Sequence, residues 1–187
     1  MNIIAGKARG RKLKTLPGEA TRPTQGKVRA ALFSTLMAWI PDAEWLDLYA
    51  GSGAVALEAV SRGARRAVLV ENASPAVAII RENIALTKLE GLEVLGLEAS
   101  AAIARLKGQR FDVVFMDPPY ADDPVPLAEA VEAANLLRDN GRLVIEHRRD
   151  RPMPEAIGGL ARLKTNRYAE TALSFYAWGA PTVEILQ

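Results

Sequence analysis

Apolar residues along the chain form short continuous runs that alternate with stretches of helical spacing. The runs at 44–50, 66–71, 92–97 and 111–117 are nearly uninterrupted, which predicts strands buried on both faces of a sheet. Between the runs, apolar residues recur three and four positions apart, as in amphipathic helices. Strands separated by helix-length segments predict a parallel sheet with helices on both faces.

The remaining elements complete this alternation. We expect helices at 25–39, after the glycine turn as far as Gly63, from Pro75 with Ser74 as its cap, at 102–106 and at 125–138. A fifth strand at 141–147 is followed by a short helix and by an antiparallel pair at 161–168 and 171–178. The sequence therefore predicts a doubly wound, Rossmann-like α/β domain at 41–187, behind a small N-terminal hairpin and helix at 1–40.

Composition narrows the classes of protein to consider. The 187 residues suffice for one domain with a full core, and no apolar run approaches the roughly 18 residues that cross a bilayer. The start, "MNIIAGKARGRKLK", lacks the apolar core of a signal peptide. The chain has no cysteine and one histidine, His147, which argues against disulfides, thiol nucleophiles and a zinc site. We expect a cytoplasmic protein without a metal, and a monomer.

The charge is unevenly distributed. Residues 1–30 carry eight basic residues and one acidic residue, or +7, while the other residues carry 16 basic and 21 acidic residues, or −5. A basic arm on an acidic body predicts a polyanionic partner, and a nucleic acid is the first candidate. The alternative is a solvated tail without a partner.

Three acids stand at predicted strand ends, where open α/β sheets bind their ligands. These are Asp47, Glu71 and Asp117. Gly51 and Gly53 follow the first strand, and glycines there let a ligand approach the backbone closely. A tight turn without a ligand is the alternative interpretation of these glycines.

Two cofactors suit this arrangement. A dinucleotide would place its pyrophosphate on the turn and its ribose on Glu71, whereas S-adenosylmethionine would place its methionine end near the turn and its ribose on Glu71. Asp47 favours the second cofactor, because a carboxylate repels a pyrophosphate and attracts an ammonium group. Glu98 and the Ala99 amide, at the end of the third strand, are candidates for contact with an adenine edge.

The segment "DPPY", Asp117 to Tyr120, ends the fourth strand. Asp117 and the carbonyl of Pro118 can accept hydrogen bonds from an exocyclic amine, with Pro119 stiffening the backbone between them. Tyr120 offers a ring on which a base can stack, worth about 1–3 kcal/mol in comparable contacts. A base used in this way must be unstacked or flipped. The alternative is a simple chain reversal with Tyr120 in the core. Glu146 is either a supporting group or an ordinary solvated strand end.

These residues resemble those of the RsmD family, bacterial methyltransferases that modify a guanine N2 in 16S rRNA. The similarity extends over nearly the whole chain and includes "IIAGKARGRKL" (3–13), "RPTQGKVRAALF" (22–33), "LDLYAGSGAVALEAVSRGA" (46–64), "VLVE" (68–71), "FMDPPY" (115–120) and "VIEH" (144–147). The two N-terminal motifs are the specific part, because many methyltransferases share the glycine turn.

The resemblance implies a role for each matching position. It implies an S-adenosylmethionine site at Asp47, Gly51, Ser52, Gly53 and Glu71, which we extend to Asn72, Glu98, Ala99 and Thr24. It implies a catalytic segment at Asp117, Pro118, Pro119 and Tyr120. It also implies 16S rRNA or the small ribosomal subunit as partner, bound by Arg9, Arg11 and Lys12, to which we add Arg22, Lys27 and Arg29.

Three other functions remain as alternatives. A DNA adenine-N6 methyltransferase shares the DPPY-type segment, although such enzymes usually carry a target-recognition insertion. An RNA-binding ribosome-assembly factor could keep the fold without the activity. A nicotinamide oxidoreductase is the weakest alternative, because the chain leaves no second domain for a substrate.

Overall fold

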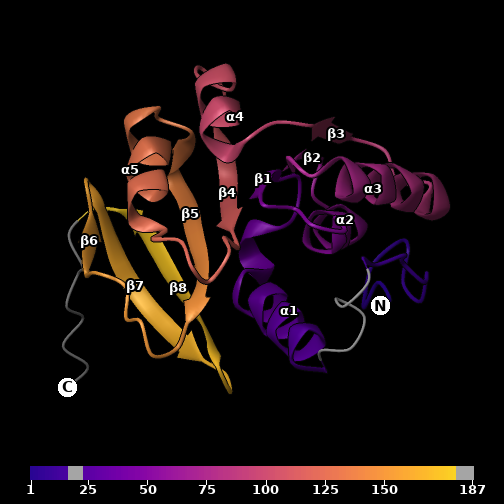
Figure 1. Ribbon diagram of the computed structural model, residues 1–187, viewed down its shortest axis with the longest axis horizontal. Helices are drawn as coiled ribbons and strands as arrows, with labels where there is room; N and C mark the ends of the chain where they lie inside the picture. The colour runs from indigo at the N-terminus through magenta and orange to yellow at the C-terminus, as the bar shows by residue number, and fades with distance from the viewer. Residues whose placement is uncertain (17–22, 180–187) are drawn as a thin grey trace.

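A single mixed sheet forms the centre of the molecule. The computed structural model describes residues 1–16 and 23–179, with residues 23–25 as backbone only. The strands are β1 (Glu44–Leu48), β2 (Arg66–Val70), β3 (Leu92–Leu95), β4 (Phe111–Met116), β5 (Leu137–Arg148), β6 (Ala156–Ile157), β7 (Leu160–Arg167) and β8 (Thr171–Trp178). They lie in the order β3-β2-β1-β4-β5-β8-β7-β6, with β1 to β5 parallel and β8, β7 and β6 antiparallel (Figure 1). The predicted Rossmann-like sheet with antiparallel C-terminal strands is confirmed.

Helices cover both faces of this sheet (Figure 1). They are α1 (Pro23–Thr35), the 3-10 helix η2 (Met37–Trp39), α2 (Ala54–Ser61), α3 (Ser74–Thr87), α4 (Ala99–Arg105) and α5 (Val125–Ala133). Val113 and Phe115 of β4 pack in one core with α1, α2 and α3, while Val114 and Met116 pack in the other with α4 and α5. Because successive strand side chains point to opposite faces, an apolar run such as β4 requires a layer on each side.

Several predicted boundaries are wrong, and each has a local reason. The last helix ends at Ala133 instead of 138, because Asn135 adopts a left-handed conformation (φ 54) and the chain turns into β5. Ser74 is the first helical residue, not the cap; Ala73 holds the cap position, and its amide binds Glu71. The helix expected at 25–39 stops at Thr35 and continues as η2. No helix occupies the described link between β5 and β7, which contains β6.

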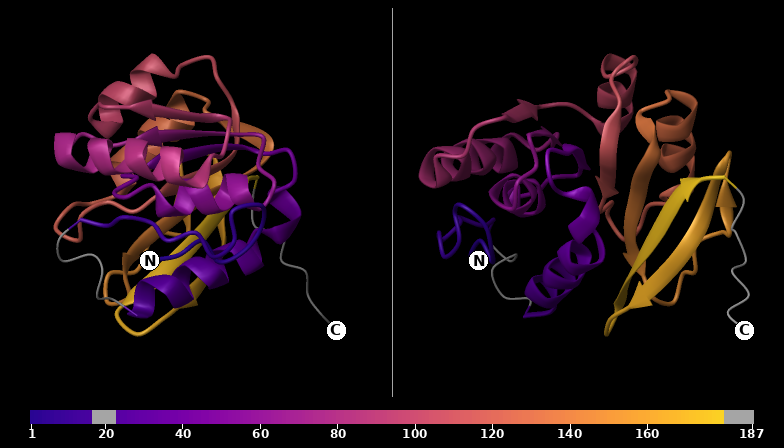
Figure 2. Two further views of the ribbon diagram at one scale, coloured as in Figure 1. Left: turned by 90° about the vertical axis from the view of Figure 1, so that its right-hand side faces the viewer. Right: turned by 180° about the vertical axis from the view of Figure 1, so that it is seen from behind.

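The described first part of the basic arm, residues 1–16, packs on α2. Its two halves fold back on each other as a short hairpin: Asn2 and Lys12 form an antiparallel bridge, and backbone hydrogen bonds join Ile3 to Gly10 and Arg11, and Met1 to Leu13. Ile3 and Leu13 are buried against Leu57 of α2, and Figure 2 shows the arm lying beside α2. The arm is therefore fixed to the helix that follows the glycine turn.

A buried carboxylate on α2 holds the start of this arm. Glu58 has no exposed surface, and its two oxygens accept hydrogen bonds from the amides of Ile4 (2.7 Å) and Ala5 (2.9 Å). Arg62 donates from Nε to the same carboxylate at 2.7 Å. A buried charge is tolerated only when it is paired and hydrogen-bonded in this way.

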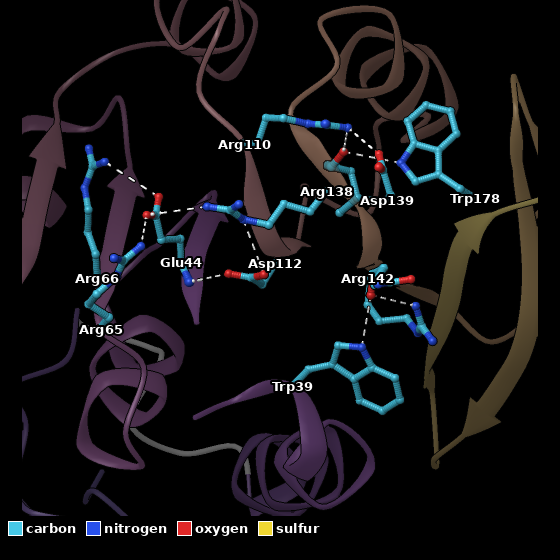
Figure 3. Close-up of polar contacts among 12 residues, drawn as sticks. Trp39, Glu44, Arg65, Arg66, Arg110, Asp112, Arg138, Asp139, Arg142 and Trp178 are labelled. Atoms are coloured by element: carbon cyan, nitrogen blue, oxygen red, sulfur yellow. Dashed lines mark hydrogen bonds and ion pairs between the residues drawn. The ribbon is translucent and has the colours of Figure 1, made fainter. Parts of the chain in front are cut away.

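Charged side chains at the amino ends of the parallel strands pair with one another. Glu44 at the start of β1 forms ion pairs with Arg65, Arg66 and Arg138, and its amide donates to Asp112 at 2.8 Å (Figure 3). These contacts close the amino edge of the sheet. The predicted site residues lie at the opposite edge.

Two glycines of the arm provide a matched test of its docking. Gly6 and Gly10 both have φ +82, but a Cβ on Gly6 would lie 1.7 Å from the carbonyl oxygen of Ser61, whereas a Cβ on Gly10 would meet nothing within 4 Å. Each alanine substitution carries a cost of about 1–2 kcal/mol for the left-handed conformation. We expect Gly6→Ala to cost about 1–3 kcal/mol more, as a steric clash typically does.

The measurement is the free energy of unfolding in urea, together with the rate of proteolysis within the arm. Equal values for Gly6→Ala and Gly10→Ala would contradict the docking of the arm on α2.

Candidate active site

A cleft of about 1100 Å³ opens at the carboxyl ends of β1, β2 and β4. Strand register produces it: Leu48 of β1 pairs with Val70 of β2 and with Met116 of β4, so Glu71 and Asp117 follow at the same level. The predicted residues that line it are Asp47, Gly51, Ser52, Glu71, Asn72, Glu98, Asp117, Pro118, Pro119 and Tyr120. The residues expected to hold a cofactor and those expected to act on a base therefore share one cleft.

Some predicted site residues lie elsewhere. Gly53 is absent from the cleft wall and shapes the turn: it precedes α2 with φ 79, and a Cβ there would lie 3.1 Å from the Leu69 side chain. Ala99 is buried as the first residue of α4. Thr24 belongs to the backbone-only start of α1, and Arg22 lies outside the described residues.

Asp47 is a buried carboxylate at the floor of the cleft. It is 1% exposed, and its Oδ2 accepts a hydrogen bond from the Ala56 amide at 3.2 Å. Its Oδ1 is buried and has no hydrogen-bond partner among the residues described. Burial raises the pKa of Asp47 to about 8; the Ala56 amide opposes this increase and the Glu71 charge adds to it. The site therefore suits a ligand that brings a positive charge or a hydrogen-bond donor.

Glu71 ties the glycine turn to the start of α3. Its Oε2 accepts from the Gly51 amide and its Oε1 from the Ala73 amide, both at 2.9 Å. Each carboxylate oxygen has a second lone pair that can accept from a ligand hydroxyl. The neighbouring Asn72 donates to Glu98, which joins the ends of β2 and β3 at the cleft.

The Asp117–Tyr120 segment is held by its backbone. The Asp117 amide donates to the Leu48 carbonyl at 3.4 Å, the Pro119 carbonyl accepts from the Asp122 amide at 2.9 Å, and Arg151 Nη1 donates to the Tyr120 carbonyl at 2.9 Å. Two of the three carbonyls after Asp117 are thus engaged in shaping the loop. Pro118 also lines the cleft, and its carbonyl accepts no hydrogen bond from residues 1–16 or 23–179.

Comparisons with known proteins agree with this geometry. The family model described as "Conserved hypothetical protein 95" matches residues 1–177. Ribosomal RNA small subunit methyltransferase D of Escherichia coli K12 is 40% identical over 146 residues, which cover 78% of this chain and 71% of that protein. The enzyme of the same name from Haemophilus influenzae is 34% identical over 157 residues, covering 82% and 81%. The chain belongs to the RsmD family of rRNA methyltransferases.

Solved structures extend the RsmD match to the whole fold. A hypothetical protein from Thermus thermophilus aligns with a TM-score of 0.82 and 37% identity, covering 94% of this chain and 98% of that one. The Escherichia coli protein yhhF aligns with a TM-score of 0.85 and 31% identity, covering 95% and 97%. A more distant protein, SMU.776, solved with S-adenosylhomocysteine, shows only the fold, at 12% identity and a TM-score of 0.67.

Sequence reasoning missed part of the wall of this RsmD cleft. Tyr49 lines it with a left-handed backbone (φ 67), and burial, followed by the charges of Asp122 and Glu98, raises the pKa of its hydroxyl. The position of Tyr49 in the sequence, between Asp47 and Gly51, could have identified it as a residue of the cleft. Thr171, at the start of β8, reaches the cleft from far along the sequence and donates to Glu146 at 3.1 Å. No local pattern could have indicated that contact.

The predicted RNA-binding residues divide into two groups. Arg9, Arg11, Lys12 and Lys27 are exposed. Arg29, also predicted to bind RNA, differs from these four: its side chain is 6% exposed, lines the cleft, and donates from Nη2 to the Asn2 carbonyl at 2.6 Å. Burial lowers the pKa of Arg29, and the Glu58 carboxylate, 4.0 Å away, partly offsets this effect. Arg29 fastens the arm to α1.

Two other features concern residues 1–16 and 23–179 only. No helix in these ranges has the length and apolar character needed to cross a membrane. No three His, Cys, Asp or Glu side chains in these ranges are grouped so that they could hold a metal ion.

The pKa of Asp47 predicts a pH dependence of stability. The carboxyl of this residue titrates at about 8 in the fold against 3.8 in the unfolded chain, so between these values the folded state keeps a proton that the unfolded state loses. The contribution of this carboxyl to the free energy of unfolding therefore falls as pH rises from about 4 to 8. We expect the stability advantage of Asp47→Asn over the parent to grow from pH 5 to pH 8, as measured by urea unfolding. An advantage that does not change with pH would contradict the raised pKa.

Proposed function

We propose that this protein transfers a methyl group from S-adenosylmethionine to the exocyclic N2 of a guanine in 16S rRNA. One observation carries the proposal: the turn around Gly51, with Asp47 and Glu71, lines the same cleft as Asp117–Tyr120. A donor held by the first group and a base held by the second would meet within that cleft. Proximity of this kind supplies much of the rate in a transfer between two bound molecules.

The residues of the cleft fit the donor. The buried Oδ1 of Asp47, without a partner among the described residues, suits the ammonium of the methionine end. Glu71 can accept hydrogen bonds from the ribose hydroxyls while it holds Gly51. When bound, S-adenosylmethionine supplies an electrophilic methyl group on a sulfonium sulfur.

The Asp117–Tyr120 segment would orient the nucleophile. The lone pair of an exocyclic guanine amine is delocalised into the ring, so the amine is a poor nucleophile until both N–H groups are held. Asp117 and the Pro118 carbonyl would accept those two hydrogen bonds and stabilise the charge that develops on nitrogen. Asp117 would also receive the proton that the nitrogen loses. Tyr120 would stack on the base after it leaves its helix.

Residues 1–40, which include the arm and α1, would form an extension that binds the RNA backbone. Arg9, Arg11 and Lys12 are exposed on a segment anchored next to the cleft, which suits contacts to phosphates. The relatives named for small-subunit rRNA support 16S rRNA as the substrate. The protein would act on it in the cytoplasm. Base choice would come from the pocket, since phosphate contacts carry no sequence information.

A pair of substitutions separates the two halves of the site. Asp117→Ala is expected to lower the rate of methyl transfer to small ribosomal subunits by about 100-fold or more, as loss of a transition-state contact does, with the affinity for S-adenosylhomocysteine nearly unchanged. Glu71→Ala is expected to weaken that affinity about tenfold or more, because it removes charged hydrogen bonds from the turn.

Calorimetric titration and transfer of a radiolabelled methyl group give the two readouts. Turnover at the parent rate by Asp117→Ala would refute the assigned chemistry, and unchanged cofactor affinity of Glu71→Ala would refute the donor site.

A further inference from the structure

Asn83 of α3 lies between the basic arm and the glycine turn. Its side chain has no exposed surface. Oδ1 accepts a hydrogen bond from the Lys14 amide at 2.8 Å, and Nδ2 donates to the Lys14 carbonyl and to the Ser52 carbonyl, each at 2.9 Å. The two donor hydrogens and the acceptor of one amide are all in use.

These bonds fix the turn from a second side. Ser52 is 5% exposed and follows Gly51, whose amide is held by Glu71. Gly51 and Ser52 both line the cleft. The backbone that would surround the donor is therefore held by Glu71 at one residue and by Asn83 at the next.

The side-chain amide of Asn83 also fixes the arm at Lys14. Lys14 follows the exposed Arg11 and Lys12 by three and two residues, and its own side chain pairs with Glu82 of α3. Displacement of the Lys14 backbone would break two partly buried hydrogen bonds unless the Asn83 amide moved with it. Because that amide also holds Ser52, the displacement would reach the turn.

We propose that Asn83 is a positioning residue that couples RNA binding by the arm to cofactor binding in the cleft. This inference rests on the proposed function, since it requires RNA on the arm and S-adenosylmethionine at the turn. An arm held in its docked position by RNA keeps the Ser52 carbonyl in place for the cofactor. The coupling is reciprocal, so a bound cofactor strengthens RNA binding by the same factor.

The test compares the affinity for in vitro transcribed 16S rRNA with and without saturating S-adenosylhomocysteine. We expect the cofactor product to tighten RNA binding about fivefold or more in the parent, the lower end of typical couplings, and to have almost no effect in Asn83→Ala. Ser61→Ala is the matched control. Ser61 is also buried, and its hydroxyl binds Ala5 and Ala8 of the arm rather than the turn. This control should weaken RNA binding but keep the ratio of the two affinities.

A second pair of variants approaches the contact from the arm, in case Asn83→Ala does not fold. The Lys14 side chain is 60% exposed, so substitution there leaves the core intact. Lys14→Ala removes the charge and keeps both backbone hydrogen bonds, whereas Lys14→Pro also removes the amide that binds Asn83. The coupling should persist in Lys14→Ala and fall in Lys14→Pro.

The possible outcomes are distinct. The inference is supported if the coupling is lost in Asn83→Ala and Lys14→Pro but kept in Ser61→Ala and Lys14→Ala. A parent that binds both molecules without coupling, or variants that keep the coupling, would overturn it and leave the proposed function standing. A parent that binds neither molecule would overturn the proposed function and this inference with it.

Discussion

Parallel pairing of β1 with β2 and β4 is the constraint on which the site depends. The register that aligns Leu48 with Val70 and with Met116 brings Asp47, Glu71 and Asp117 to one edge of the sheet, although 70 residues separate the first from the last. Glu71 and Asp117 directly follow the last residues of β2 and β4, and Asp47 is the last but one residue of β1. The sheet therefore supports three carboxylates at one edge while its interior stays apolar.

The carboxyl of Asp47 is buried at this edge of the sheet. The carboxyl lies at the inner end of the cleft, one residue before β1 ends, and has little solvent to stabilise its charge. A group so buried without a full set of partners lowers stability, a common feature of binding sites. A cationic ligand group would remove this cost.

Polar groups buried in α2 and α3 give the arm a fixed place beside the cleft. Glu58, Ser61 and Asn83 bind backbone atoms of the arm, not its side chains. Arg9, Arg11 and Lys12 consequently remain exposed for another partner. The same helices begin at the turn around Gly51 and behind Glu71, so arm and cleft share one framework.

Sequence reasoning reached the sheet, most of its helices and most of the cleft, because strand periodicity and strand-end acids are local signals. It failed where contacts between residues far apart in the sequence determine the burial or the partners of a side chain. Arg29 reads as another basic residue of the arm, and only the folded chain shows its guanidinium buried near Glu58. Asn83 reads as a polar residue in a helix, and its contact with Ser52, 31 positions away, has no sequence signature. Leu136 and Leu137 continue a helical spacing that Asn135 ends through its backbone conformation.

Identification of the methylated nucleoside tests the central claim most directly. Small ribosomal subunits without their native guanine methylations, and duplex DNA in parallel, would be incubated with radiolabelled S-adenosylmethionine, digested to nucleosides and examined by mass spectrometry. The account predicts N2-methylguanosine from the 16S rRNA. Label in DNA as N6-methyladenine, or no label in either substrate while the cofactor still binds, would contradict it.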